Sequence, residues 1–128
     1  MVDTEKITIN MSVVDLGQID LLVEEGFYSN RTDLIRTAIR NLLANHQEGI
    51  KQITTRKSMG VGAVGYNKRE LEEYRQRGEQ LEIRVVGLFA LGADVTPDLA
   101  RATIRSIKIS GVFHASEEVK TALADRML

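Results

Sequence analysis

The stretch "KITINMS", residues 6–12, alternates apolar and polar side chains. The apolar ones are Ile7, Ile9 and Met11, and the polar ones are Lys6, Thr8 and Asn10. Alternation with a period of two predicts a β-strand with one apolar face and one polar face. The sequence on either side of this strand must therefore supply both a cover for the apolar face and a use for the polar one.

Two amphipathic helices are predicted directly after the strand. Ser12 is suited to cap the first helix, which Gly26 ends. Asn30 is suited to cap the second, whose apolar side chains recur at helical spacing as far as Leu43. Residues 6–47 are thus predicted to form one strand and two helices joined by short turns.

This small unit needs a second copy of itself. A single strand has two unpaired edges, and two amphipathic helices bury little surface between them. If residues 6–12 pair antiparallel with the same residues of a second chain, the apolar face covers four helices in an intertwined, swapped homodimer. The polar face then appears twice, related by a two-fold axis.

The order of these elements resembles the ribbon-helix-helix family of CopG-like and Arc-like repressors over residues 5–47. The motifs that carry the resemblance are "KITINMS", the helix that ends at Gly26, and "SNRTDLIR" at the start of the second helix. In that family the two-stranded ribbon lies in the DNA major groove. The resemblance therefore implies that Lys6, Thr8 and Asn10 contact base edges.

Base reading suits the chemistry of these side chains. Lys donates to guanine, Asn can bridge adenine, and Thr can contact the methyl group of thymine. The alternative is an exposed polar face that only keeps the strand soluble.

The start of the second helix is the expected phosphate site. Backbone N–H groups without an acceptor and the helix dipole attract anions at this end, and the resemblance implies the same use. The expected phosphate contacts are Ser29, Asn30, Arg31 and Thr32.

Length, composition and charge limit the other possibilities. The 128 residues leave room for one or two small domains, and the absence of cysteine excludes disulfides and thiolate ligands. No signal peptide or membrane span is apparent, so a cytoplasmic location is expected. Net charge is −4 in residues 1–49, +3 in 50–80 and 0 in 81–128. An acidic N-terminal part argues against indiscriminate binding to nucleic acid.

The C-terminal half carries no resemblance that we identify. Its sequence predicts a short strand at 60–66, then a helix, a strand at 81–91, a short helix, a strand at 104–113 and a closing helix at 116–128. The segments "RVVGLF" at 84–89 and "KISGVF" at 108–113 are similar, which predicts two stacked, parallel rungs. The predicted class is α+β, with a ribbon-helix-helix domain at 1–48, a linker at 49–59 and a small α/β domain with parallel or solenoid-like strands at 60–128.

No catalytic, metal or cofactor site is predicted. His46 and His114 are the only histidines, and without cysteine they form a poor ligand set for zinc or nickel. Gly60, Gly62 and Gly65 lack the spacing of a phosphate-binding loop.

The leading functional prediction is a non-enzymatic, DNA-binding transcriptional regulator, most simply a repressor, that acts on double-stranded DNA as a homodimer or a higher homo-oligomer. One alternative is an antitoxin that represses its own operon and wraps a toxin with its C-terminal half. Another is a structural assembly protein that uses the ribbon only to dimerise.

Overall fold

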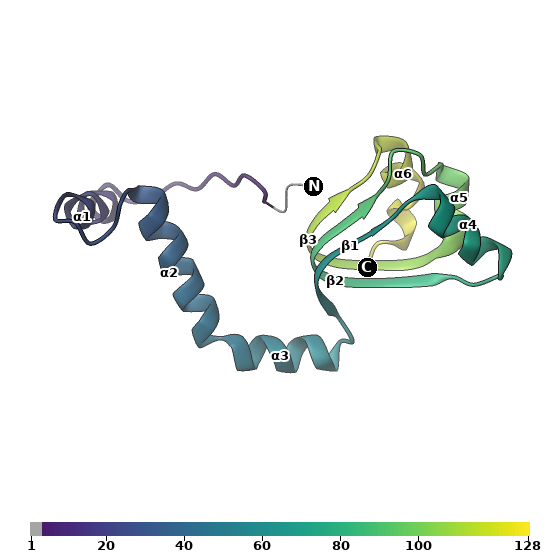
Figure 1. Ribbon diagram of the computed structural model, residues 1–128, viewed down its shortest axis with the longest axis horizontal. Coiled ribbons are helices and arrows are strands. Elements are labelled where there is room, and N and C mark those ends of the chain that lie inside the picture. Colours follow the sequence, from purple (N-terminus) through teal and green to yellow (C-terminus); the bar gives the residue numbers. More distant parts are fainter. Residues whose placement is uncertain (1–3) are drawn as a thin grey trace. The chain divides into compact units, whose positions relative to one another are not determined.

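The computed structural model describes residues 4–128, which form two compact units. One unit spans Lys6–Ile53, and the other contains Thr54–Leu128 together with Thr4 and Glu5. Figure 1 shows the elements of both units.

The N-terminal unit contains helix α1 (Val13–Glu24), which begins and ends as predicted. The Ser12 hydroxyl oxygen accepts a hydrogen bond from the Asp15 N–H at 3.1 Å. At the other end the N–H of Gly26 donates to the Val23 carbonyl, and the N–H of Phe27 donates to the Leu22 carbonyl. This pattern is the Schellman motif, and Gly26 adopts its positive φ of 84°.

Helix α2 (Arg31–Asn45) follows with Asn30 as its N-cap. The Asn30 side-chain oxygen accepts from the N–H of Asp33 at 2.8 Å. Since Asn30 remains in an extended conformation, the chain turns into the helix at Arg31. The cap prediction is confirmed.

The strand predicted at 6–12 is not formed in the single chain, where residues 4–12 belong to no helix or strand. A β-strand is defined by hydrogen bonds to a neighbouring strand, and no strand within residues 4–128 pairs with this segment. The ribbon and the swapped dimer therefore remain predictions.

A helix, α3 (Gln47–Arg56), occupies most of the predicted linker at 49–59. The sequence analysis expected no helix in this segment, and its role as a linker remains a prediction. Gly49 and the β-branched residues Ile53, Thr54 and Thr55 weaken the helical signal. The helix places Thr54 in a buried position, which fixes that side chain within the C-terminal unit.

The C-terminal unit alternates strands and helices. Its further elements are β1 (Gly60–Tyr66), α4 (Lys68–Gln76), β2 (Leu81–Leu91), α5 (Pro97–Thr103), β3 (Ile104–His114), α6 (Glu117–Ala122) and the 3₁₀ turn η1 (Ala124–Arg126). The strands form one parallel sheet in the order β1-β2-β3. The parallel-strand prediction is confirmed, and the helices lie along one face of the sheet (Figure 1).

The similarity between 84–89 and 108–113 is visible in the strand register. Arg84 lies beside Lys108 and Phe89 beside Phe113, so the two segments are neighbours residue for residue. Gly62, Gly87 and Gly111 form a row across all three strands, with φ values of 137°, 136° and 133°. A Cβ on Gly87 would meet the Gly62 carbonyl oxygen at 2.1 Å. The row therefore requires glycine.

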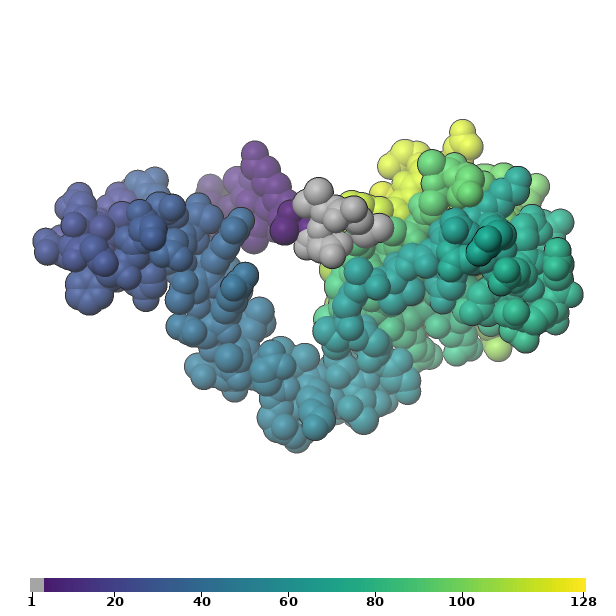
Figure 2. Space-filling view, viewed as in Figure 1, coloured from purple at the N-terminus to yellow at the C-terminus, as the bar shows by residue number. Residues whose placement is uncertain are grey.

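The core lies between the sheet and its helices. Phe89 and Ile107 from the strands are fully buried, together with Leu71, Leu99 and Leu123 from the helical side. Figure 2 shows the residues from β1 onward, coloured teal to yellow, as a densely packed body. This unit thus has a core of its own.

The closing helix is shorter than the predicted 116–128. Ser116 caps it, accepting from the Val119 N–H at 3.2 Å, but α6 ends at Ala122. Beyond η1, the N–H of Leu128 donates to the Ile107 carbonyl at 2.8 Å. The last residues therefore lie along the free edge of β3.

Candidate nucleic-acid interface

The predicted base-contacting residues Lys6, Thr8 and Asn10 lie in the extended segment that precedes α1, and all three are exposed. The apolar residues between them are exposed as well, at 74% for Ile7 and 62% for Ile9. In the single chain, this segment offers its polar and its apolar side chains equally to solvent.

The whole N-terminal unit lacks a core. No residue between Lys6 and Ile53 is buried, although both helices carry apolar stripes. The exposed large apolar side chains of this unit are Ile7, Ile9, Met11, Val13, Val14, Leu21, Leu22, Phe27, Ile39, Leu42, Leu43 and Ile53. Burying side chains of this size stabilises a protein by about 1.5–3 kcal/mol each. A surface this apolar is typical of a protein–protein interface.

Arg31, a predicted phosphate contact, is engaged by a carboxylate. Its Nε donates to Oδ1 of Asp20 at 2.7 Å and its Nη2 donates to Oδ2 at 2.8 Å. The hydrogen bonds hold the pKa of the Asp20 carboxyl below its ordinary value and raise the pKa of Arg31. The pair joins α1 to the first residue of α2.

The other predicted phosphate contacts surround the same helix start. The N–H of Ser29 donates to Oδ2 of Asp33 at 3.0 Å, while Asn30 caps the helix. The N–H groups of Arg31 and Thr32 stand in the first turn, where no intrahelical acceptor exists. The structure thus brings Ser29, Asn30, Arg31 and Thr32 together at one helix end.

Two carboxylates also belong to this helix end. Sequence reasoning treated Arg31 as a free cation, and it did not find Asp20. The two residues are eleven positions apart in the chain, which no helical spacing links. Asp20 and Asp33 therefore offset the attraction of Arg31 for a phosphate.

Other kinds of site find little support in the structure. Among residues 4–128, no three His, Asp or Glu side chains gather in a way that could hold a metal ion. His46 is the C-cap of α2, and His114 ends β3. Gly60, Gly62 and Gly65 lie within strand β1. No helix in the described part of the chain has the length and apolar character needed to cross a membrane.

Comparison with known proteins gave one family match. The model of the Ribbon-Helix-Helix transcriptional regulator family matches residues 2–120. Neither the curated proteins nor the solved structures gave a match. The match extends through both units, well beyond the residues 5–47 that carry the resemblance seen in the sequence. The chain belongs to the Ribbon-Helix-Helix transcriptional regulator family.

Proposed function

We propose that the chain is a sequence-specific DNA-binding repressor that acts as a homodimer. Membership of the family supports DNA binding and transcriptional regulation. The observation that carries the dimer is the N-terminal unit, in which no residue is buried and the segment 6–12 has no strand partner. A second copy supplies both the partner strand and the cover for the apolar helix faces.

Dimer formation places the apolar side chains of residues 6–12 on the inner face of the ribbon and the polar ones on its outer face. Antiparallel pairing turns Ile7, Ile9 and Met11 onto the helices and leaves Lys6, Thr8 and Asn10 on the outer face of the ribbon. A two-stranded ribbon fits the major groove of B-DNA, which is about 12 Å wide. In this arrangement the polar face reads bases, and the start of α2 fixes the register on the phosphates.

The folded C-terminal unit favours a repressor over an antitoxin. Segments that wrap a partner are commonly disordered until they bind, whereas residues 54–128 have a buried core and a three-stranded sheet. This unit is better suited to assembly or ligand sensing than to wrapping a toxin.

Selection of bound fragments from random duplex DNA with the full-length protein tests the proposal. We expect recovery of a symmetric or tandem motif, because two-fold related ribbons read two half-sites. Sedimentation of the same preparation should give a dimer or a multiple of it. Equal recovery of all sequences, or a monomer at micromolar concentration, would overturn the proposal.

A further inference from the structure

Within the described part of the C-terminal unit, helices cover one face of the sheet. The helices pack against the face that contains Val85, Phe89 and Ile107. Alternation along β2 turns Val86 and Leu88 to the opposite face, which none of the described helices α4, α5 and α6 covers. Parallel sheets are usually covered on both faces, so this bare face is unusual.

A cavity of about 450 Å³ lies on the bare face. Its floor combines the glycine row with small and apolar side chains, among them Ala63 from β1, Leu88 from β2 and Val112 from β3. Gly62 and Gly87 carry no side chains, so the backbone of both strands forms part of the floor. The volume falls within the range of about 300–1,000 Å³ that is usual for small-molecule sites.

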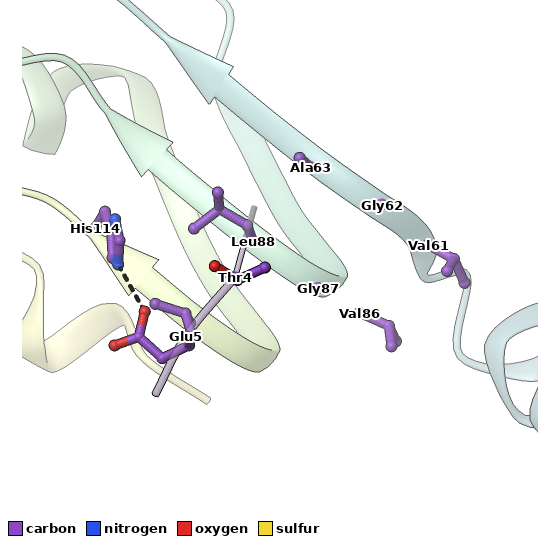
Figure 3. Close-up of a pocket in the computed structure, with 10 residues that line it drawn as sticks. Thr4, Glu5, Val61, Gly62, Ala63, Val86, Gly87, Leu88 and His114 are labelled. Carbon is purple, nitrogen blue, oxygen red and sulfur yellow. Dashed lines mark ion pairs between the residues drawn. The ribbon is translucent and has the colours of Figure 1, made fainter. Parts of the chain in front are cut away.

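One histidine and one glutamate stand together at the rim of this cavity. Nε2 of His114 lies 3.5 Å from Oε2 of Glu5, and Thr4 also lines the cavity. Figure 3 shows Glu5 and His114 pointing toward one another, with Leu88 and Ala63 on the neighbouring strands. His114 is the only lining residue that can become cationic, and a carboxylate already lies beside it. The rim of the cavity thus holds one contact between an imidazole and a carboxylate.

The Glu5 carboxylate is easily replaced. Both side chains of the pair are more than half exposed, at 52% for His114 and 54% for Glu5. Ion pairs of such exposure contribute little free energy. A ligand that carries a carboxylate on an apolar body makes the same ion pair and also buries its body against the floor.

We propose that this cavity binds an apolar monocarboxylic acid, with its carboxylate on His114 in place of Glu5 and its body over Ala63, Leu88 and Val112. Glu5 directly precedes Lys6, the first residue of the predicted ribbon, so such a ligand is suited to act as an effector. That regulatory part rests on the proposed function, whereas ligand binding itself does not and is tested without DNA.

Titration of the full-length protein with octanoate tests the site, with 1-octanol at the same pH as the neutral probe. Methyl NMR signals of Ala63, Leu88 and Val112 should shift with octanoate. We expect octanol to bind about fivefold more weakly, the effect of losing one half-exposed ion pair.

Two rim variants should change octanoate affinity in opposite directions. His114→Gln removes the cation and should weaken binding about fivefold, to the level of octanol. Glu5→Gln removes the competing carboxylate and should strengthen binding. Ala63→Phe fills the cavity and should abolish binding, whereas Ala93→Phe, in the exposed turn after β2, should leave it unchanged.

Three results would overturn the proposal. The first is the absence of methyl shifts at the cavity with octanoate. The second is equal binding of octanoate and octanol together with an unchanged affinity in His114→Gln. The third is a set of cavity methyl signals that shift with protein concentration and not with ligand, since this would show that a second copy covers the face.

Discussion

Arg31 and Asp20 are joined by two parallel hydrogen bonds, of 2.7 and 2.8 Å, between the guanidinium and the carboxylate. This geometry is the strongest that an arginine makes with a carboxylate. Arg31 has further N–H donors, but part of its charge is offset where a DNA phosphate would lie. Asp20 therefore weakens the phosphate contact that we propose for Arg31.

Asp20→Asn should strengthen the phosphate contact that we propose for Arg31. We expect tighter binding to every duplex and a steeper dependence of affinity on salt, because Arg31 then contributes its full charge to phosphate binding. Arg31→Ala should have the opposite effect on both quantities. Fluorescence anisotropy across a salt series, on the selected operator and on an unrelated duplex, measures the two slopes.

Asp15→Asn is the matched control, since Asp15 also lies in α1 but makes no ion pair in the described part of the chain. A loss in Arg31→Ala confined to the operator sequence would contradict a phosphate role. Unchanged salt slopes in both Asp20→Asn and Arg31→Ala would place the phosphate contact elsewhere.

The proposed base contacts predict a different pattern. Thr8→Ala and Asn10→Ala should each weaken operator binding by about 1–3 kcal/mol, because they remove contacts to base edges. Non-specific binding and the circular dichroism spectrum should not change, since both side chains are exposed. Asn45→Ala, at the end of α2, is the control. Wild-type operator affinity in both variants would exclude the ribbon as the reader.

The pair of Arg101 and Asp125 predicts a loss of stability in acid. A hydrogen bond of 2.9 Å from Nη1 of Arg101 holds the pKa of the Asp125 carboxyl below its ordinary value of 3.8. A carboxyl whose pKa is lower in the folded state stabilises that state above about pH 4, and this contribution disappears as pH falls through the lowered pKa.

Denaturant unfolding of the full-length protein between pH 2 and pH 6 checks this prediction. Stability should fall below about pH 4 in the wild type, and Asp125→Asn should show a smaller fall over the same range. Asp98→Asn is the control, because no ion pair of Asp98 is found within residues 4–128. Identical pH profiles for wild type and Asp125→Asn would show that the pair does not persist in solution.

The glycine row predicts strong sensitivity to a single methyl group. Gly87→Ala and Gly111→Ala place a Cβ 2.1 and 2.0 Å from a backbone oxygen of the next strand. Each also strains a positive φ, so we expect a loss of more than about 2 kcal/mol in unfolding free energy.

Gly49→Ala is the control for this row. Gly49 lies within α3 with nothing near its Cβ position, so alanine should stabilise the helix by up to about 1 kcal/mol. Thermal unfolding followed by circular dichroism ranks the variants. Melting of Gly87→Ala at the wild-type temperature would show that the row can rearrange.

Local signals in the sequence predicted most elements of the fold. Ser12 and Asn30 cap helices as their chemistry indicates, and the run "LEIRVVGLFAL" forms β2 from Leu81 to Leu91. Cap chemistry and apolar runs act over a few residues, so one sequence is enough to detect them.

Contacts that depend on tertiary structure could not be predicted in this way. Arg31 pairs with Asp20, and His114 pairs with Glu5. The partners are too far apart in the sequence for helix or strand periodicity to relate them. Helix α3 was missed because Gly49 and its β-branched residues are poor helix formers taken locally. The predicted ribbon needs a partner strand from a second chain, so it remains a prediction.

The apolar face of residues 6–12 gives the sharpest test of the dimer. Ile9 is 62% exposed in the single chain, and truncation of so exposed a side chain normally changes stability by less than about 0.5 kcal/mol. If Ile9 is buried between two copies, Ile9→Ala should instead cost about 2–4 kcal/mol and make unfolding depend more strongly on protein concentration. Leu128→Ala, at 72% exposure, is the control. Unfolding and sedimentation over a hundredfold concentration range measure both effects, and equal behaviour of the two variants would mean that Ile9 faces solvent and that the ribbon does not form.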